Sequence, residues 1–179
     1  RFVYLLLFLS SSLQAYSYRV RIEGIDDKNI TTTIKETVQV FNKSNSIISS
    51  NASLKKVAAE DVDRVTQACK FYGYLSANTT YSITQTEEPL VVFKVELGPL
   101  YHINHFTIIP DTIGVDIIKT GTTATTSNIL KTEQEVIETL INMGYRFAAI
   151  THRSVHADIA THTVDHTITI NPGKLVYLQ

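Results

Sequence analysis

An internal repeat of about 75 residues constrains the fold of this chain more than any single motif. A Gly-Tyr pair closes a helix-like pattern twice, at residues 73–74 and at residues 144–145. Each pair leads through two strand-like segments to a pair of glycine and proline, at residues 98–99 and at residues 172–173. Repeated small modules usually present surfaces rather than build one enclosed active site. The repeat therefore favours a binding protein over an enzyme.

The hydrophobic periodicity predicts the same order of elements in both repeats: strand, helix, helix, strand, strand. In the first repeat the segments are expected at residues 18–23, 30–41, 54–72, 75–83 and 91–97. In the second they are expected at residues 101–108, 113–118, 129–143, 147–155 and 164–170, with a bulge near Asn104. We predict an α+β fold of tandem β-α-α-β-β units, each a three-stranded mixed sheet with two helices on one face.

The start of the chain predicts export. Residues 2–9 form an unbroken apolar run, which is far shorter than the roughly 20 residues that cross a bilayer. Small residues follow, and cleavage is expected after Ala15 or after Ser17. We therefore predict a signal peptide at residues 1–17, a first unit at residues 18–98 and a second unit at residues 99–171. Residues 172–179 are expected to begin a third unit.

Composition excludes several functions. The net charge is −1 and 18% of residues are charged, without a basic stripe, so nucleic acid is not an expected partner. Cys69 is the single cysteine, which rules out an intrachain disulfide, and it falls on an apolar helix face as a core residue. The carboxylates of Glu60, Asp61 and Asp63 are expected on the solvent side of the same helix.

The sequence predicts no catalytic set, no metal and no cofactor. It has no phosphate-binding loop, no Gly-x-Ser-x-Gly motif and no His-Glu-x-x-His motif. The minor alternative is a zinc site on the last hairpin, because two histidine pairs with even spacing occupy its two strands. These histidines are His152, His156, His162 and His166. The competing interpretation is a polar strand face on which histidine is one of many side chains.

Taken in order, these features resemble tandem POTRA (polypeptide-transport-associated) domains. The matching segments are residues 72–74, 95–103, 144–145 and 172–173, and the resemblance covers residues 18–179. It implies the periplasmic part of a bacterial outer-membrane protein, exported by a signal peptide. The chain departs from the family pattern in the short first helix of its second unit and in having no membrane barrel.

The resemblance implies a role in the insertion, assembly or translocation of outer-membrane proteins or autotransporters. Expected partners are unfolded outer-membrane proteins and an inner-membrane or periplasmic partner subunit, with membrane contact through a C-terminal barrel that is not present in this chain. Alternatives are a module of a two-partner secretion transporter, a POTRA-bearing cell-division protein, or an unrelated secreted enzyme or adhesin-like domain.

The strand after each Gly-Tyr pair is expected at a sheet edge, where unpaired backbone groups bind an extended client. The predicted binding residues are Leu75, Ala77, Asn78, Thr80, Tyr81, Phe147, Ala149, Thr151 and Arg153. Proline at Thr80 or Thr151 is therefore expected to weaken binding. The glycines that end the helices, Gly73 and Gly144, are expected at positive φ.

Overall fold

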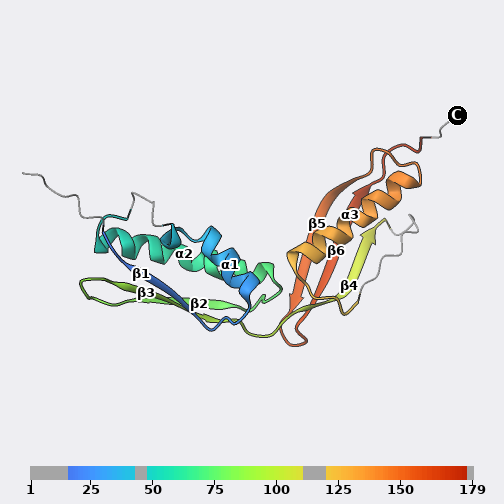
Figure 1. The fold of residues 1–179 in the computed structure, drawn as a ribbon. Helices are drawn as coiled ribbons and strands as arrows, with labels where there is room; N and C mark the ends of the chain where they lie inside the picture. Colours follow the sequence, from blue (N-terminus) through green and yellow to red (C-terminus); the bar gives the residue numbers. More distant parts are fainter. Residues whose placement is uncertain (1–15, 43–47, 111–119, 177–179) are drawn as a thin grey trace, which may run out of the picture.

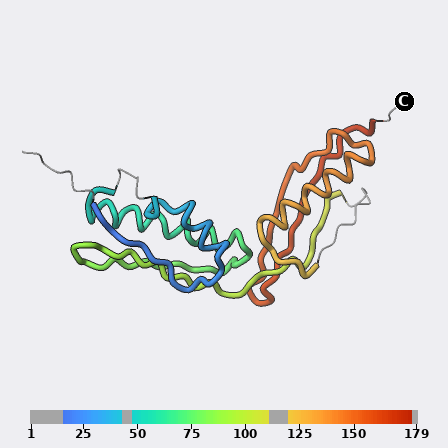
Figure 2. The backbone as a smooth tube through the Cα atoms, in the orientation of Figure 1, coloured from blue at the N-terminus to red at the C-terminus, as the bar shows by residue number. Residues whose placement is uncertain are grey.

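The computed structural model describes residues 16–42, 48–110 and 120–176. Its elements form two units, each a three-stranded mixed sheet covered by helix on one face, joined by a short connection at residues 97–101 (Figure 1). The backbone trace shows the two units following each other along the molecule, with the C-terminus on the second (Figure 2). The fold is α+β, as the sequence predicts.

The first sheet has the strand order β1-β3-β2. Its strands are β1 (Arg19–Glu23), β2 (Asn78–Ile83) and β3 (Leu90–Glu96). β1 runs parallel to β3, and β2 runs antiparallel to it. The last strand of the unit is thus the central one, and within the described residues both other strands pair with it alone.

Two helices cover the first sheet. In α1 (Lys28–Thr37), Asp27 is the N-cap and its carboxylate accepts from Asn29 N at 2.7 Å. In α2 (Asn51–Phe71), Ser50 and Ser53 form a reciprocal capping box. The buried apolar side chains of both helices and of the sheet form one core, which includes Ile30, Ile34, Leu54, Val65, Cys69, Val91 and Phe93. Burial raises the pKa of the Cys69 thiol to about 11, as expected for an unreactive core residue.

The expected first helix ends earlier than its apolar pattern suggests. Residues 30–41 were expected to be one helix, but α1 ends at Thr37, Val38 is extended, and a 3₁₀ turn follows at Gln39–Phe41. The cause is the buried carboxylate of Asp61 on α2, which accepts from Gln39 N at 3.1 Å and from Val40 N at 2.8 Å. These two N–H groups therefore bond to a side chain instead of extending the helix.

The second sheet repeats the topology with the order β4-β6-β5. Its strands are β4 (His102–Ile109), β5 (Ala149–Asp158) and β6 (Thr163–Asn171), with β4 parallel and β5 antiparallel to β6. The register of β4 shifts between Ile103 and His105, which confirms the bulge expected near Asn104. The helix expected at residues 113–118 lies outside the described residues.

The second unit is covered by α3 (Thr126–Asn142), whose N-cap is Thr125. Val136 and Leu140 of α3 pack on Ile168 and Ile170 of β6. Gly73 and Gly144 follow α2 and α3 at φ values of +93° and +101°, where a Cβ would strain the backbone. Among the helices in the described ranges, none combines the length and hydrophobicity needed to cross a membrane.

Candidate functional site

The two strands that follow the long helices, β2 and β5, are the candidate binding sites. In the described part of the chain, β2 pairs only with β3, and β5 pairs only with β6. Each is therefore an outer strand, with one row of backbone N–H and C=O groups facing away from its sheet. Figure 1 shows both strands on the outside of their units, next to the helix that precedes them.

A hydrogen bond at the end of β2 shows which residues face its open side. Thr84 N donates to Leu90 O at 3.1 Å, so the backbone of Thr84 points toward β3. Successive residues of an antiparallel strand point alternately toward and away from the partner, and β2 has no register shift. The backbone groups on the open side therefore belong to Thr79, Tyr81 and Ile83. The prediction that Thr80 offers its N–H to a client is wrong, because that group points into the ladder with β3.

A first groove lies between α2 and the end of β2. It has a volume of about 640 Å³ and is lined by Asn51 and Lys55 of the helix and by residues 81–86 on the strand side. Tyr81 and Ile83 are partly buried and pack on the core of the first unit. The same residues that present backbone groups to the open edge thus also form the floor of an adjoining groove.

A second groove lies in the second unit, between the middle of α3 and the first half of β5. It is smaller, with a volume of about 280 Å³. Its lining consists of Leu130, Glu133, Gln134 and Ile137 from the helix and Ile150 and Arg153 from the strand. An extended chain added to β5 would place alternate side chains over this groove.

Some of the predicted binding residues lie on the outer strands and some do not. Asn78, Thr80 and Tyr81 are in β2, and Ala149, Thr151 and Arg153 are in β5. Thr151 is the extra residue at a register shift between Ile150 and His152.

Three predicted binding residues lie before the strands. Leu75 and Ala77 precede β2, and Phe147 precedes β5, because a turn separates each Gly-Tyr pair from its strand. Ala77 is buried in the core of the first unit, and Leu75 packs against the second unit. The assignment of these three residues to the edge strands is therefore wrong.

A charged cluster, which the sequence analysis did not identify, borders the second groove. Arg153 Nε donates to Glu133 Oε2 at 2.7 Å and to Oε1 at 2.9 Å. His166 Nε2 lies 3.1 Å from Glu133 Oε1, too poorly aligned for a hydrogen bond, and its ring packs edge-on against Phe106. Glu133 and His166 are almost completely buried, whereas the Arg153 side chain is about half exposed.

The pKa of His166 is lowered, chiefly because burial disfavours the charged imidazolium, and the nearby Glu133 only partly opposes this. The ring is therefore neutral near pH 7, and Arg153 is the counter-charge of Glu133. This arrangement joins the outer strand β5 to α3 through an ion pair.

The first unit has apolar and aromatic residues at the corresponding places. Counted back from the glycine that follows each long helix, Gly73 or Gly144, Val62 of the first unit corresponds to Glu133 of the second. Counted back from the glycine that follows each central strand, Gly98 or Gly173, Val91 corresponds to His166. Tyr81 and Arg153 face equivalent central-strand residues, Phe93 and Ile168. The charged cluster of the second unit therefore has no counterpart in the first unit.

Both buried carboxylates have a signature in the sequence. Asp61 stands four residues from both Val57 and Val65, and Glu133 stands four residues from both Ile129 and Ile137. That spacing places each carboxylate inside the apolar stripe of its helix. The expectation that Asp61 lies on a hydrated face is wrong, since it is fully buried, while Glu60 and Asp63 are exposed.

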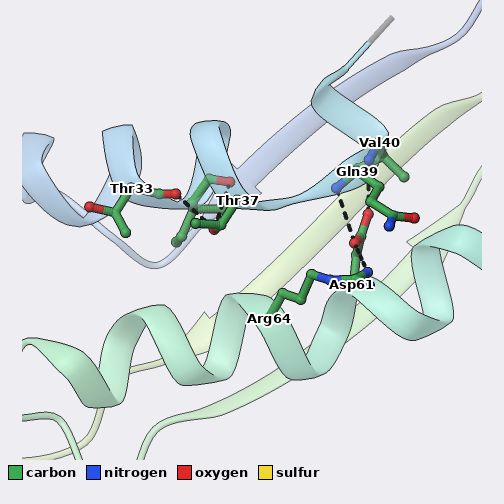
Figure 3. Close-up of polar contacts among 7 residues, drawn as sticks. Thr33, Thr37, Gln39, Val40, Asp61 and Arg64 are labelled. Carbon is green, nitrogen blue, oxygen red and sulfur yellow. Dashed lines mark hydrogen bonds and ion pairs between the residues drawn. The ribbon is translucent and has the colours of Figure 1, made fainter. Parts of the chain in front are cut away.

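Asp61 has a structural role. Figure 3 shows its carboxylate between the two helices, where it accepts hydrogen bonds from Gln39 N and Val40 N. It also accepts from the guanidinium of Arg64, whose Nη1 lies 2.6 Å from Oδ1. Thr37, in the last turn of α1, donates its hydroxyl to Thr33 O at 2.8 Å (Figure 3). The carboxylate thus ties the chain after α1 to α2 and takes no part in either groove.

The four hairpin histidines do not come together. His166 faces α3 and is buried, whereas His152 and His156 are exposed on β5, and His162 lies in the turn at φ +55°. The zinc alternative is therefore wrong. In the described ranges no group of three His, Cys, Asp or Glu side chains is placed to hold a metal ion.

Comparison with known proteins gives a mixed result. No protein-family model and no curated protein matches the chain. Among solved structures it is similar to POTRA domains 3–5 of BamA from Haemophilus influenzae, at 18% identity and a TM-score of 0.48 over 92% of this chain and 69% of that one. It is also similar to POTRA domains 1–2 of Omp85 from Anabaena, at 15% identity and a TM-score of 0.43, covering 90% and 96% of the two chains.

A further similarity is to CdiB from Acinetobacter baumannii, at 11% identity and a TM-score of 0.41, over 88% of this chain and 29% of that one. Similarities of this size carry no argument about function.

Proposed function

We propose that this chain is the periplasmic POTRA module of an outer-membrane barrel protein that assists the insertion, assembly or translocation of outer-membrane proteins or autotransporters. Its role is to bind, without catalysis, unfolded clients or a partner subunit by strand addition at β2 and β5. Within that superfamily the chain most resembles TamA, the barrel subunit of the translocation and assembly module. The shared features are a strand soon after the leader and a long polar segment between the first two helices.

One observation carries the proposal: in both units the strand after the long helix is an outer strand beside a groove. Backbone pairing tolerates many side-chain sequences, which suits a protein with many clients. The groove adds contacts to every second side chain of an added strand, so strands with alternating apolar residues are favoured. Outer-membrane barrel strands have this alternation.

The test is nuclear magnetic resonance with a ten-residue peptide that has the alternating pattern of a barrel strand. Strand addition at β2 shifts the amide signals of Thr79, Tyr81 and Ile83 more than those of Thr80 and Ser82. Addition at β5 shifts signals of Ala149–Asp158. If the shifts concentrate instead on β1 and β4, the other outer strands of the two sheets, the proposal of strand addition at β2 and β5 is wrong.

A further inference from the structure

The side of β5 that faces α3 carries a single charge among apolar residues. Its side chains lie opposite buried residues of the central strand β6, which are Val164, His166, Ile168 and Ile170. Directly opposite residues of an antiparallel pair share one face of the sheet. The residues of β5 on this side are therefore Ile150, Arg153, Val155 and Ala157. A strand added along the open edge of β5 would place every second side chain on the same side.

The guanidinium of Arg153 has donors that its ion pair does not use. Its Nε donates to both carboxylate oxygens of Glu133, at 2.7 Å and 2.9 Å. Its two Nη atoms carry four further N–H groups, and within the described residues these have no hydrogen-bond partner. Arginine can bind a carboxylate through two parallel hydrogen bonds. The half-exposed Arg153 side chain can therefore accept a second carboxylate from outside the chain.

The charge that this ion pair presents to the open edge is positive. The Glu133 side chain is only 4% exposed, against 54% for Arg153. His166 is buried as well and its lowered pKa keeps the ring neutral near pH 7. A side chain that reaches the pair from an added strand therefore meets the guanidinium first. Opposite charges across neighbouring strands stabilise a sheet, and like charges destabilise it.

Apolar side chains flank this charge in the second groove. On α3 the groove is lined by Leu130, one turn before Glu133, and by Ile137, one turn after it. The neighbours of the arginine on the same side of β5 are also apolar. Leu130 and Val155 are each 53% exposed, which leaves apolar area for a partner to cover. The site is therefore complementary to one carboxylate with apolar side chains on both sides of it.

We propose that β5 selects client strands that carry an aspartate or glutamate between apolar residues on the side facing the groove, and that the Nη groups of Arg153 bind this carboxylate. Such selection rests on the proposed strand addition at β5. It gives the second unit a narrower set of clients than backbone pairing alone, which tolerates many sequences. A carboxylate one position along the client strand points to the other face of the sheet, away from the arginine.

The test uses two pairs of ten-residue peptides with alternating apolar and polar residues. The first pair has glutamate or glutamine at a central apolar position, and the second pair has them at the neighbouring polar position. Nuclear magnetic resonance near pH 7 measures the dissociation constant of each peptide from the amide signals of β5. In the first pair the glutamate peptide is expected to bind about fivefold more tightly, and in the second pair the two peptides bind equally. High salt is expected to reduce the preference.

Each of the other results overturns the proposal. Equal binding of glutamate and glutamine in the first pair removes the selection but leaves strand addition at β5 intact. The same preference in both pairs shows a response to net charge, not recognition by Arg153. If none of the four peptides shifts the signals of β5, strand addition at this strand is itself wrong, and the selection fails with it.

A variant without the charged cluster provides the second readout. Arg153→Leu alone is unsuitable, because it leaves Glu133 buried without its counter-charge. The triple variant Glu133→Val, Arg153→Tyr and His166→Val removes the whole cluster. At β5 it is expected to bind both peptides of the first pair alike, while peptide binding at β2 stays as in wild type. If the variant keeps the fivefold preference at β5, Arg153 is not its source.

Discussion

Arg153 Nε lies 2.7 Å from Glu133 Oε2, so an ion pair fastens the outer strand β5 to the helix α3. Glu133 is buried and the Arg153 side chain is half exposed. A charge that points inward from an outer strand is one way in which proteins limit unwanted strand pairing. The ion pair therefore holds β5 against α3, and its charge restricts which strands can pair beside β5.

Removing the arginine alone is expected to destabilise the second unit. Arg153→Leu leaves the Glu133 carboxylate buried without its counter-charge, at a cost of about 1–3 kcal/mol in unfolding free energy. The triple variant Glu133→Val, Arg153→Tyr and His166→Val copies the first unit and is expected to be as stable as wild type or more so. Hydrogen exchange of the Ile168 amide in β6 measures the unfolding free energy of the second unit in both variants. Equal stability of Arg153→Leu and wild type would contradict this account.

His166 predicts how stability depends on pH. Burial lowers the pKa of His166 in the folded protein below its unfolded value of 6.5. At a pH between the folded and unfolded pKa values, the unfolded chain binds a proton that the folded chain does not. The unfolding free energy of the second unit is therefore expected to fall as pH decreases below 6.5. His166→Leu should flatten this slope, whereas the exposed control His152→Leu should keep it. Urea unfolding at a series of pH values checks the difference.

Asp61 predicts a large stability loss in the first unit. Asp61→Ala leaves the N–H groups of Gln39 and Val40 without their acceptor, which is expected to cost about 3 kcal/mol. The exposed neighbour Asp63→Ala is the control and should change stability by less than about 0.5 kcal/mol. Thermal unfolding followed by circular dichroism compares the two. Similar melting temperatures would show that the carboxylate does not hold this turn.

The structure also narrows the expected site of signal cleavage. Tyr16 packs on the core of the first unit and its hydroxyl bonds to Asn51, while Ser17 Oγ donates to Glu88 at 3.2 Å. Cleavage after Ser17 would remove both contacts, so we expect cleavage after Ala15. N-terminal sequencing of the exported protein should start at Tyr16. A start at Tyr18 would contradict this choice, and an intact Arg1 would contradict export with cleavage.

The parts of the fold that follow from periodicity were predictable from the sequence. Strand β3 is predicted by the alternation of Val91, Phe93 and Val95, since a buried strand face repeats every two residues. Helix α2 is predicted by the stripe of Leu54, Val65 and Cys69, since a buried helix face repeats about every 3.6 residues. The repeat extends the same argument to β6 and α3.

Features that depend on tertiary contacts were not predictable in this way. The end of α1 at Thr37 depends on Asp61, which is more than twenty residues distant in the chain. The direction of the Thr80 N–H depends on ladder register, which side-chain alternation does not specify. The ion pair of Glu133 and Arg153 joins two elements whose relative position is known only after folding.

The most direct test of client binding compares two substitutions at one residue of β2. Tyr81→Ala removes the ring but keeps the N–H group on the open edge, whereas Tyr81→Pro removes that group as well. Both variants are checked for folding by circular dichroism, and binding of the alternating ten-residue peptide is measured by fluorescence anisotropy. If clients bind by strand addition, Tyr81→Pro binds at least about tenfold more weakly than Tyr81→Ala at the first unit. Equal binding by the two folded variants would contradict strand addition at β2.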